Sequence, residues 1–153
     1  MTTSDAPLVI IPCGSAKAFT AQPARDLYRG AYFKMCLRWA LAVAQPEDIR
    51  ILSAKYGLVE LDRRLEPYEL LMGSSGSISA ARLREQATEQ RLLERPVLMA
   101  AGARYRALVT RVWPAATDVL AGTRGMGYQM ARLKYLTEEA NRGANSRPSF
   151  GWT

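Results

Sequence analysis

The sequence predicts one three-layer α/β domain, in which about four parallel strands form the central sheet and helices cover both faces. Four short apolar runs have the length and composition of buried strands, and they lie at residues 7–12, 49–52, 96–101 and 117–121. Segments with helical spacing of apolar residues follow these runs. Alternation of strand and helix produces a parallel sheet with helices on both sides. A chain of 153 residues is long enough to give such a domain a substantial core.

In the N-terminal half, prolines bound the first apolar run, which predicts a strand buried on both faces. Apolar residues at helical spacing predict a helix over 27–44, and Asp26 is placed to cap its N-terminus. The second strand leads into residues 53–72, which have neither a helical nor a strand period. A connection this long in a compact domain is usually functional. We therefore expect residues 53–72 to form a wall of a site, although a structured surface loop closed by ion pairs is the simpler alternative.

In the C-terminal half, Ser77 or Ser79 is expected to cap a helix that precedes the third strand. A short helix follows the third strand. The fourth, weaker strand leads through the glycine-rich residues 122–129 into the last helix. The expected organisation is a single domain over 1–140 and a C-terminal tail over 141–153, which has too little apolar content to fold alone and forms a packed arm or a mobile end.

The composition is that of an ordinary globular protein with a basic balance. Lysine and arginine number 21 against 14 aspartates and glutamates, for a net charge of +7. Such a balance favours nucleic acid or another polyanion as a partner, although a solvated arginine-rich surface explains it equally well. No apolar run is long enough to span a bilayer, and the first residues lack the features of a signal peptide. We therefore expect a cytoplasmic protein without membrane contact.

The chain has no histidine and only two cysteines, Cys13 and Cys36. The lack of histidine excludes Ser-His-Asp and Cys-His catalysis and every metal site that contains histidine. Two cysteines do not make a disulfide framework or a structural zinc site. Our expectation is that the protein needs neither a metal nor another cofactor. Cys36 falls in an apolar helical pattern and is expected in the core, whereas Cys13 ends a strand and opens a turn.

Residues 13–28, 53–72 and 122–129 each follow a predicted strand. Because the carboxyl ends of parallel strands meet at one edge of a sheet, these segments are expected to converge on a single pocket. The first segment is similar to an anion-binding loop, and the third places glycines at a helix N-terminus. The candidate residues of this pocket are Cys13, Gly14, Ser15, Lys17, Asp26, Tyr28, Ser53, Lys55, Tyr56, Glu66, Tyr68, Arg124, Gly125 and Gln129.

Three sequence motifs resemble those of known families. The central segment contains, in order, Ser53-Ala-Lys-Tyr-Gly-Leu58, Leu61-Asp62, Pro67-Tyr68-Glu-Leu70 and Met72-Gly73. This order resembles the signature of the YaaA peroxide-stress family. The opening Ile-Pro-Cys-Gly-Ser-Ala-Lys17 is similar to the start of a domain found in archaeosine synthases. The layout over most of residues 8–136 resembles short stand-alone bacterial and phage domains, which also carry motifs like Arg25-Asp26-Leu27-Tyr28 and Gly125-Met-Gly-Tyr-Gln-Met-Ala-Arg-Leu-Lys134.

The resemblance implies DNA binding, modified-base chemistry and a fold like that of uracil-DNA glycosylases. The chain lacks the Asp-Pro-Tyr motif and the histidine of those enzymes, and it is much shorter than YaaA proteins. The expected function is a DNA glycosylase that hydrolyses the N-glycosidic bond of a modified base and leaves an abasic site. Two other classes fit the same residues: a non-catalytic nucleic-acid-binding protein of stress or defence, and an enzyme that acts on free nucleotides or nucleosides.

Hydrolysis of an N-glycosidic bond needs a carboxylate, which orients water or stabilises the oxocarbenium-like transition state. It also needs a donor for the departing base and an aromatic ring that stacks on a flipped base. Asp26 is the first candidate for the carboxylate, and Glu66 is the second. A helix N-cap explains Asp26 equally well, and an ion pair with Arg63 or Arg64 explains Glu66.

Tyrosines and basic residues of the same segments are candidates for binding the substrate. Tyr56 and Tyr68 are expected to stack on the base, although packing in the core is the alternative. The remaining candidates are Lys55 or Gln129 for the base edge, and Lys17, Lys55 and Arg124 for backbone phosphates.

Overall fold

A mostly parallel sheet forms the middle of the structure, a computed structural model that describes residues 6–145. Its parallel strands are β1 (Leu8–Pro12), β3 (Ile49–Ser53), β6 (Val97–Met99) and β7 (Thr117–Asp118). β1 pairs with β3 on one side and with β6 on the other, and β6 pairs with β7. β4 (Gly57–Val59) adds an antiparallel edge to β3, so that the strand order is β4-β3-β1-β6-β7. The predicted α/β class with a mostly parallel sheet is therefore confirmed.

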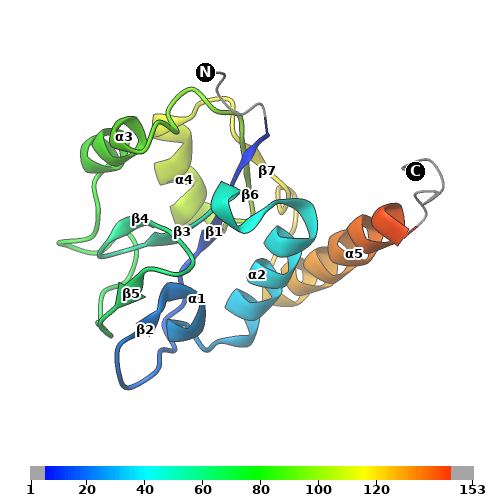
Figure 1. Cartoon of the computed structure of the whole chain (residues 1–153), viewed down its shortest axis with the longest axis horizontal. Helices are drawn as coiled ribbons and strands as arrows, with labels where there is room; N and C mark the ends of the chain where they lie inside the picture. The colour runs from blue at the N-terminus through cyan, green and yellow to red at the C-terminus, as the bar shows by residue number, and fades with distance from the viewer. Residues whose placement is uncertain (1–5, 146–153) are drawn as a thin grey trace, which may run out of the picture.

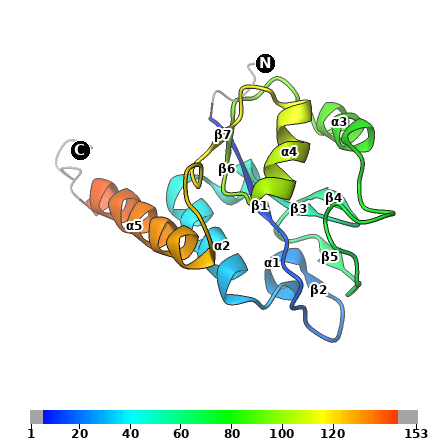
Figure 2. The same ribbon diagram turned by 180° about the vertical axis from the view of Figure 1, so that it is seen from behind.

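Helices lie on both faces of this sheet (Figures 1 and 2). α2 (Ala31–Val43) and α5 (Met126–Asn145) pack together on one face. α3 (Ala80–Glu89) and α4 (Ala103–Val112) pack together on the other. Because both faces are covered, every residue of β1 and β3 is buried, which explains the continuous apolar sequence of β1 and the mostly apolar sequence of β3.

The chain changes direction across the sheet at β1. It passes from β1 through α2 to β3, then returns through α3 to β6 on the opposite side of β1, and continues through α4 to β7. Since such crossovers are right-handed, the two directions place α2 and α4 on opposite faces. The loops that leave the carboxyl ends of β1 and β6 therefore diverge. Open α/β sheets bind ligands in the crevice that this divergence creates.

The predicted helix over 27–44 is interrupted, and the prediction that Asp26 caps it is wrong. Asp26 lies inside a separate short helix, α1 (Ala24–Leu27), and the residue that precedes α2 is Gly30. Tyr28 is extended, with φ −86° and ψ 124°, because it pairs with Lys17 in an antiparallel bridge. The helical pattern at Tyr28 is thus overridden by a pairing with a residue eleven positions earlier.

Residues 53–72 are more regular than their sequence indicates. They contain β4 and also β5 (Arg64–Leu65), which pairs with β2 (Gln22–Pro23). Strands of two or three residues are too short for a period to be visible in the sequence. β2 and β5 nevertheless join the segment after β1 to the segment after β3, as the convergence argument expects.

Several smaller expectations can be compared with the structure. Ser79 caps α3, because its Oγ accepts a hydrogen bond from the backbone N–H of Arg82 at 3.1 Å. Cys36 is buried in the core as predicted.

α5 continues to Asn145, so the first residues of the expected tail are helical, and residues 146–153 lie outside the described residues. No helix within 6–145 is long and apolar enough to cross a membrane. A single 3₁₀ turn, η1 (Pro46–Asp48), leads into β3.

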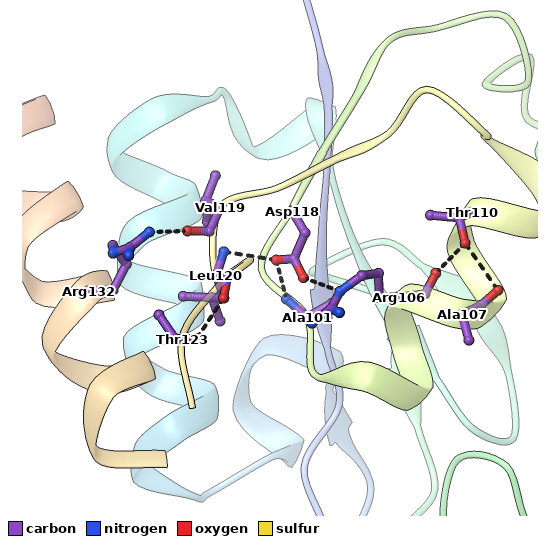
Figure 3. Close-up of polar contacts among 9 residues, drawn as sticks. All are labelled: Ala101, Arg106, Ala107, Thr110, Asp118, Val119, Leu120, Thr123 and Arg132. Atoms are coloured by element: carbon purple, nitrogen blue, oxygen red, sulfur yellow. Dashed lines mark hydrogen bonds and ion pairs between the residues drawn. The ribbon is translucent and has the colours of Figure 1, made fainter. Parts of the chain in front are cut away.

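Asp118 at the end of β7 ties the last strands to α4 (Figure 3). Its Oδ1 accepts hydrogen bonds from the N–H groups of Ala101 at 3.3 Å and Leu120 at 2.9 Å. Its Oδ2 pairs with Nε of Arg106 at 2.7 Å. A carboxylate with three donors satisfies its charge although it is almost fully buried. The loops that follow β6 and β7 are therefore held in place at the same edge of the sheet.

The turn between β3 and β4 generates the first testable prediction. Gly57 has φ +77°, and a Cβ there would lie 2.1 Å from Oε1 of Gln86 and 2.3 Å from Cδ1 of Ile78. Oε1 of Gln86 accepts from the N–H of Leu58, so the added methyl displaces this bond as well as straining the backbone. We expect Gly57→Ala to lower the free energy of unfolding by about 2–4 kcal/mol in urea titrations.

Gly76→Ala is the matched control for this prediction. Gly76 also has a positive φ, at +90°, but a Cβ there would meet no atom within 4 Å. Only the backbone strain remains, which costs about 1–2 kcal/mol. Equal losses of stability in the two variants would contradict the proposed role of the Gln86 contact.

Candidate functional site

A cavity of about 390 Å³ lies at the carboxyl ends of β1 and β6, where the strand order reverses. We call it the switch-point cavity. The loop after β1 and the starts of α2, α4 and α5 form its walls, and its lining is residues 12–16, residues 30–33, Gly102, Tyr105, Met126 and Gln129. Most of these side chains are small or aromatic. Because the cavity lies where the strand order reverses, it occupies the place where an open α/β sheet binds its ligand.

The N-termini of α2 and α4 are uncapped where they border this cavity. The residues that precede them, Gly30 and Gly102, provide no side-chain hydrogen bond to the first turn. A helix N-terminus carries a partial positive charge and free N–H groups. α5 also begins at this wall, directly after Gly125, whose φ is +84°. Three helix starts around one cavity favour an anionic group in the bound molecule.

Cys13 and Tyr105 connect the loop after β1 with the first turn of α4 at the wall of the cavity. The hydroxyl of Tyr105 lies 3.1 Å from Sγ of Cys13 and donates to the backbone carbonyl of Cys13 at 3.2 Å. Burial raises the pKa of Tyr105 well above its usual range, and the neighbouring Cys13 adds to this shift. The phenol therefore stays neutral and acts as a donor. Tyr105 is not among the predicted site residues, although it lies in the first turn of the helix that follows the third strand.

Three hydrogen-bonded hydroxyl groups, those of Tyr28, Tyr68 and Ser53, connect the segment after β1 with the segment after β3. We call them the hydroxyl chain. The Tyr68 hydroxyl lies 2.7 Å from the Tyr28 hydroxyl and 2.7 Å from Oγ of Ser53. The backbone N–H groups of Lys55 and Tyr56 donate to the same Oγ at 3.2 and 3.0 Å. Because these two donors occupy the lone pairs of the Ser53 hydroxyl, its own hydrogen is left to donate to Tyr68. Burial raises the pKa of Tyr28 to about 12, and that of Tyr68 further still, so both phenols stay protonated.

Lys17 lies over the rings of this cluster. Its Nζ is 4.3 Å from the centroid of the Tyr68 ring and 5.7 Å from that of Tyr28. The ammonium also donates to the backbone carbonyl of Ser15 at 3.3 Å. Partial burial lowers the pKa of Lys17, and the nearby Cys13 and Glu69 oppose this shift. The aromatic faces and the carbonyl together hold the amine at a defined place.

Lys17 borders a second cavity of about 470 Å³, which we call the Lys17 cavity. Its other walls are Ser15, Ser74 and residues 69–71. Ser15 also lines the switch-point cavity, so the two cavities adjoin at the loop after β1. Glu69 is the carboxylate of this wall. The sequence prediction missed it, although it follows Tyr68 directly within the motif of the central segment.

The structure brings most of the predicted residues to these two cavities and the hydroxyl chain. Cys13, Gly14, Ser15 and Gln129 line the switch-point cavity, and Lys17 lines the adjoining one. Tyr28, Ser53 and Tyr68 form the hydroxyl chain.

Tyr56 extends the aromatic cluster toward solvent. Its ring meets the ring of Tyr68 edge-on, with centroids 5.5 Å apart. Nζ of Lys55 lies 5.3 Å from the centroid of Tyr56, and the guanidinium of Arg63 lies 5.5 Å from it. The outer rim of the cluster is therefore both aromatic and basic.

Three predicted side chains lie elsewhere, and the predicted Gly125 lines neither cavity. Asp26 and Glu66 are exposed, and neither lines either of the two cavities. Arg124 lines a separate cavity over α5. Among residues 6–145, no group of three or more histidines, cysteines and acids is placed to hold a metal ion.

Comparison with known proteins identifies the family. The model of a family of unknown function, DUF6884, matches residues 8–137. This match covers most of the chain, so the chain belongs to that family. No curated protein matches it. The resemblance to YaaA proteins and archaeosine synthases stays a prediction.

The hydroxyl chain generates the second testable prediction. Tyr68→Phe removes the central hydroxyl and leaves the Tyr28 and Ser53 hydroxyls, both buried, without this partner. We expect the free energy of unfolding to fall by about 1–3 kcal/mol, measured by urea titration. Tyr56→Phe is the control, since its hydroxyl takes no part in the chain, and it should change stability by less than about 0.5 kcal/mol. Similar values for the two variants would show that the chain contributes little.

Proposed function

We propose that this member of the DUF6884 family processes bases in DNA, and that its reaction is hydrolysis of the N-glycosidic bond of a modified base. The product is an abasic site. The observation that carries the proposal is the pair of adjoining cavities at the switch point, with Lys17 held over a tyrosine cluster between the segments that follow β1 and β3. We also propose the uracil-DNA-glycosylase-like form of the fold, which the parallel sheet with helices on both faces supports.

The switch-point cavity suits a base that has left the DNA stack. Its volume of about 390 Å³ falls in the range of small-molecule sites. Enzymes that act on a base hold it between aromatic or apolar side chains and bind its edge by hydrogen bonds. Phe33 and Tyr105 supply rings, and Gln129 supplies an amide at the same wall. The uncapped starts of α2 and α4 favour a phosphate near the bound nucleotide.

Glu69 is the carboxylate that the geometry favours for activating water. It lines the Lys17 cavity, whereas Asp26 and Glu66 line neither cavity. The ammonium of Lys17 contacts the departing base or a phosphate in this arrangement. Its charge is held in place by the Ser15 carbonyl and the Tyr68 ring.

One observation favours an enzyme on free nucleotides as the second candidate. The helix starts around the switch-point cavity can bind a terminal phosphate without any DNA. Such an enzyme would bind the nucleotide tightly, without the steep salt dependence that DNA binding shows. A non-catalytic DNA-binding protein would bind DNA with a steep salt dependence but release no base.

The third prediction is that DNA affinity falls steeply with salt. The net charge of +7 and the basic rim around Tyr56 are its basis. If three phosphates are neutralised, raising salt from about 50 to 200 mM should weaken binding roughly fortyfold for a duplex and roughly twentyfold for a single strand. Fluorescence anisotropy with a labelled duplex and a labelled single strand measures this. Salt-independent binding, or none at low salt, would reject DNA as the partner and favour the free nucleotide.

The fourth prediction concerns catalysis. Glu69→Gln should retain the fold and DNA affinity but lose on the order of a hundredfold or more in the rate of base release. The assay incubates the protein with DNA that carries different modified bases and detects alkali-labile abasic sites.

Asp26→Asn and Glu66→Gln are the matched variants, because each removes one exposed carboxylate outside the two cavities. They should retain most of the activity. A large loss in either one, with Glu69→Gln fully active, would return the catalytic role to that acid. If the wild-type protein releases no base but still binds DNA, the non-catalytic function is correct.

A further inference from the structure

A shallow cavity of about 560 Å³ lies over the N-terminal half of α5, outside the two cavities described above. Its lining combines aromatic and basic side chains: Arg124, Tyr128, Ala131, Arg132 and Tyr135, with Gly122 and Thr123 at the edge. We call it the α5 surface. No acidic residue is among the described residues that line it.

The side chains of Tyr128 and Tyr135 are exposed and do not contribute to the core. Their exposed fractions are 73% and 56%, which is unusual for large aromatic side chains. α5 instead packs against α2, and its buried residues include Leu133 and Thr137. Seven residues apart on a helix, the two tyrosines share a face and are separated by about 10 Å along the axis. They present two aromatic rings in a row to solvent.

The two arginines of the surface supply positive charge beside these rings. Arg132 lies between the tyrosines in sequence, and its Nη1 donates to the carbonyl of Val119 at 3.1 Å (Figure 3). The segment that carries Val119 is itself held by the hydrogen bonds of Asp118. Part of the Arg132 guanidinium is therefore anchored, which lowers the entropy cost of using its other N–H groups for a ligand. Arg124 stands at the other end of the surface, one residue before Gly125.

We propose that the α5 surface binds a single strand of nucleic acid, with bases stacked on Tyr128 and Tyr135 and phosphates paired with Arg124 and Arg132. Alternating aromatic and basic groups are the recognised means of holding unpaired bases and their backbone. A duplex cannot use the tyrosines in this way, because its bases are stacked on one another. The absence of carboxylates from the described lining suits a polyanion better than a second copy of this basic chain.

The position of the surface connects it with the proposed function. The first turn of α5 supplies Met126 and Gln129 to the switch-point cavity, while Tyr128 belongs to the α5 surface. A strand stacked along α5 therefore leads toward the cavity proposed to hold the base. The inference rests on nucleic acid as the partner but not on base release.

The test measures binding of a fluorescent, unmodified strand of twelve thymidines by anisotropy. Replacing both tyrosines, Tyr128→Ala with Tyr135→Ala, should weaken binding on the order of tenfold or more for each ring. The matched control retains the rings, because Tyr128→Phe with Tyr135→Phe should bind within about threefold of the wild type. Leu41→Ala, at an exposed apolar residue of α2, controls for the general loss of exposed apolar area.

The charged part of the surface is tested through the salt dependence. Arg124→Gln with Arg132→Gln should make the slope of log affinity against log salt shallower by about 1.4, since each phosphate neutralised on a single strand contributes about 0.7. Arg111→Gln on α4, also an exposed arginine, should leave the slope unchanged. A strand of twelve uridines, measured in parallel, distinguishes RNA from DNA, and dependence on the tyrosines with either strand supports the proposal.

Three results would overturn the inference. Single strands that do not bind the wild-type protein would reject it, and so would equal affinity of the alanine double variant and the wild type. Sedimentation could also show that the wild type is a dimer and the alanine double variant a monomer. If strand binding is the same in both, the surface binds a second copy of the chain. Failure of base release with intact tyrosine-dependent binding would reject only the glycosylase proposal.

Discussion

The position of β1 between β3 and β6 is the constraint on which the rest of the structure depends. β1 hydrogen-bonds to a parallel partner on each side, and all of its residues are buried. Since the chain reaches those partners through crossovers on opposite faces, the loops after β1 and β6 must separate. The switch-point cavity is the space between them, and the contact between Cys13 and Tyr105 joins the loop after β1 to the first turn of α4. A different strand order would close this space and disperse its lining.

Two polar clusters keep the surrounding loops in place where the sheet ends. On the β3 side, the hydroxyls of Tyr28, Ser53 and Tyr68 connect the segment after β1 with the two ends of residues 53–72. On the β7 side, Asp118 connects the ends of β6 and β7 with α4. Buried polar groups stabilise only when their partners are all present, so each cluster specifies one arrangement of its loops. This rigidity allows Lys17 on one side and the α5 surface on the other to keep fixed positions relative to the cavity.

Much of the architecture was predictable, because it follows from short-range patterns. The apolar runs that became β1, β3 and β6 need burial on both faces, and the spacing in α2, α3 and α4 needs one buried stripe. Convergence of the segments after these strands was also predictable from parallel pairing. The helix break at Tyr28 was not, since the competing bridge to Lys17 is visible only after the chain has folded. Glu69 illustrates the same limit within the site. The sequence shows the motif that contains Glu69, but it does not show which side chains of that motif line the cavity.

The sequence by itself determined which segments form the parallel strands and the longer helices, the basic character of the chain, and which loops carry chemically useful side chains. These properties depend on neighbouring residues and on summed charge. Only the tertiary structure decided which of those side chains meet: it brought Lys17 over Tyr68, placed Glu69 in the wall of the same cavity, and left Asp26 and Glu66 outside both cavities. Tyr128 and Tyr135 likewise belong to a segment whose sequence is that of an ordinary amphipathic helix. Only the packing of α5 against α2 determines that their rings face water. The physical reason is that a helix or loop has the same local energy whichever of its faces is covered, and long-range contacts alone select the face.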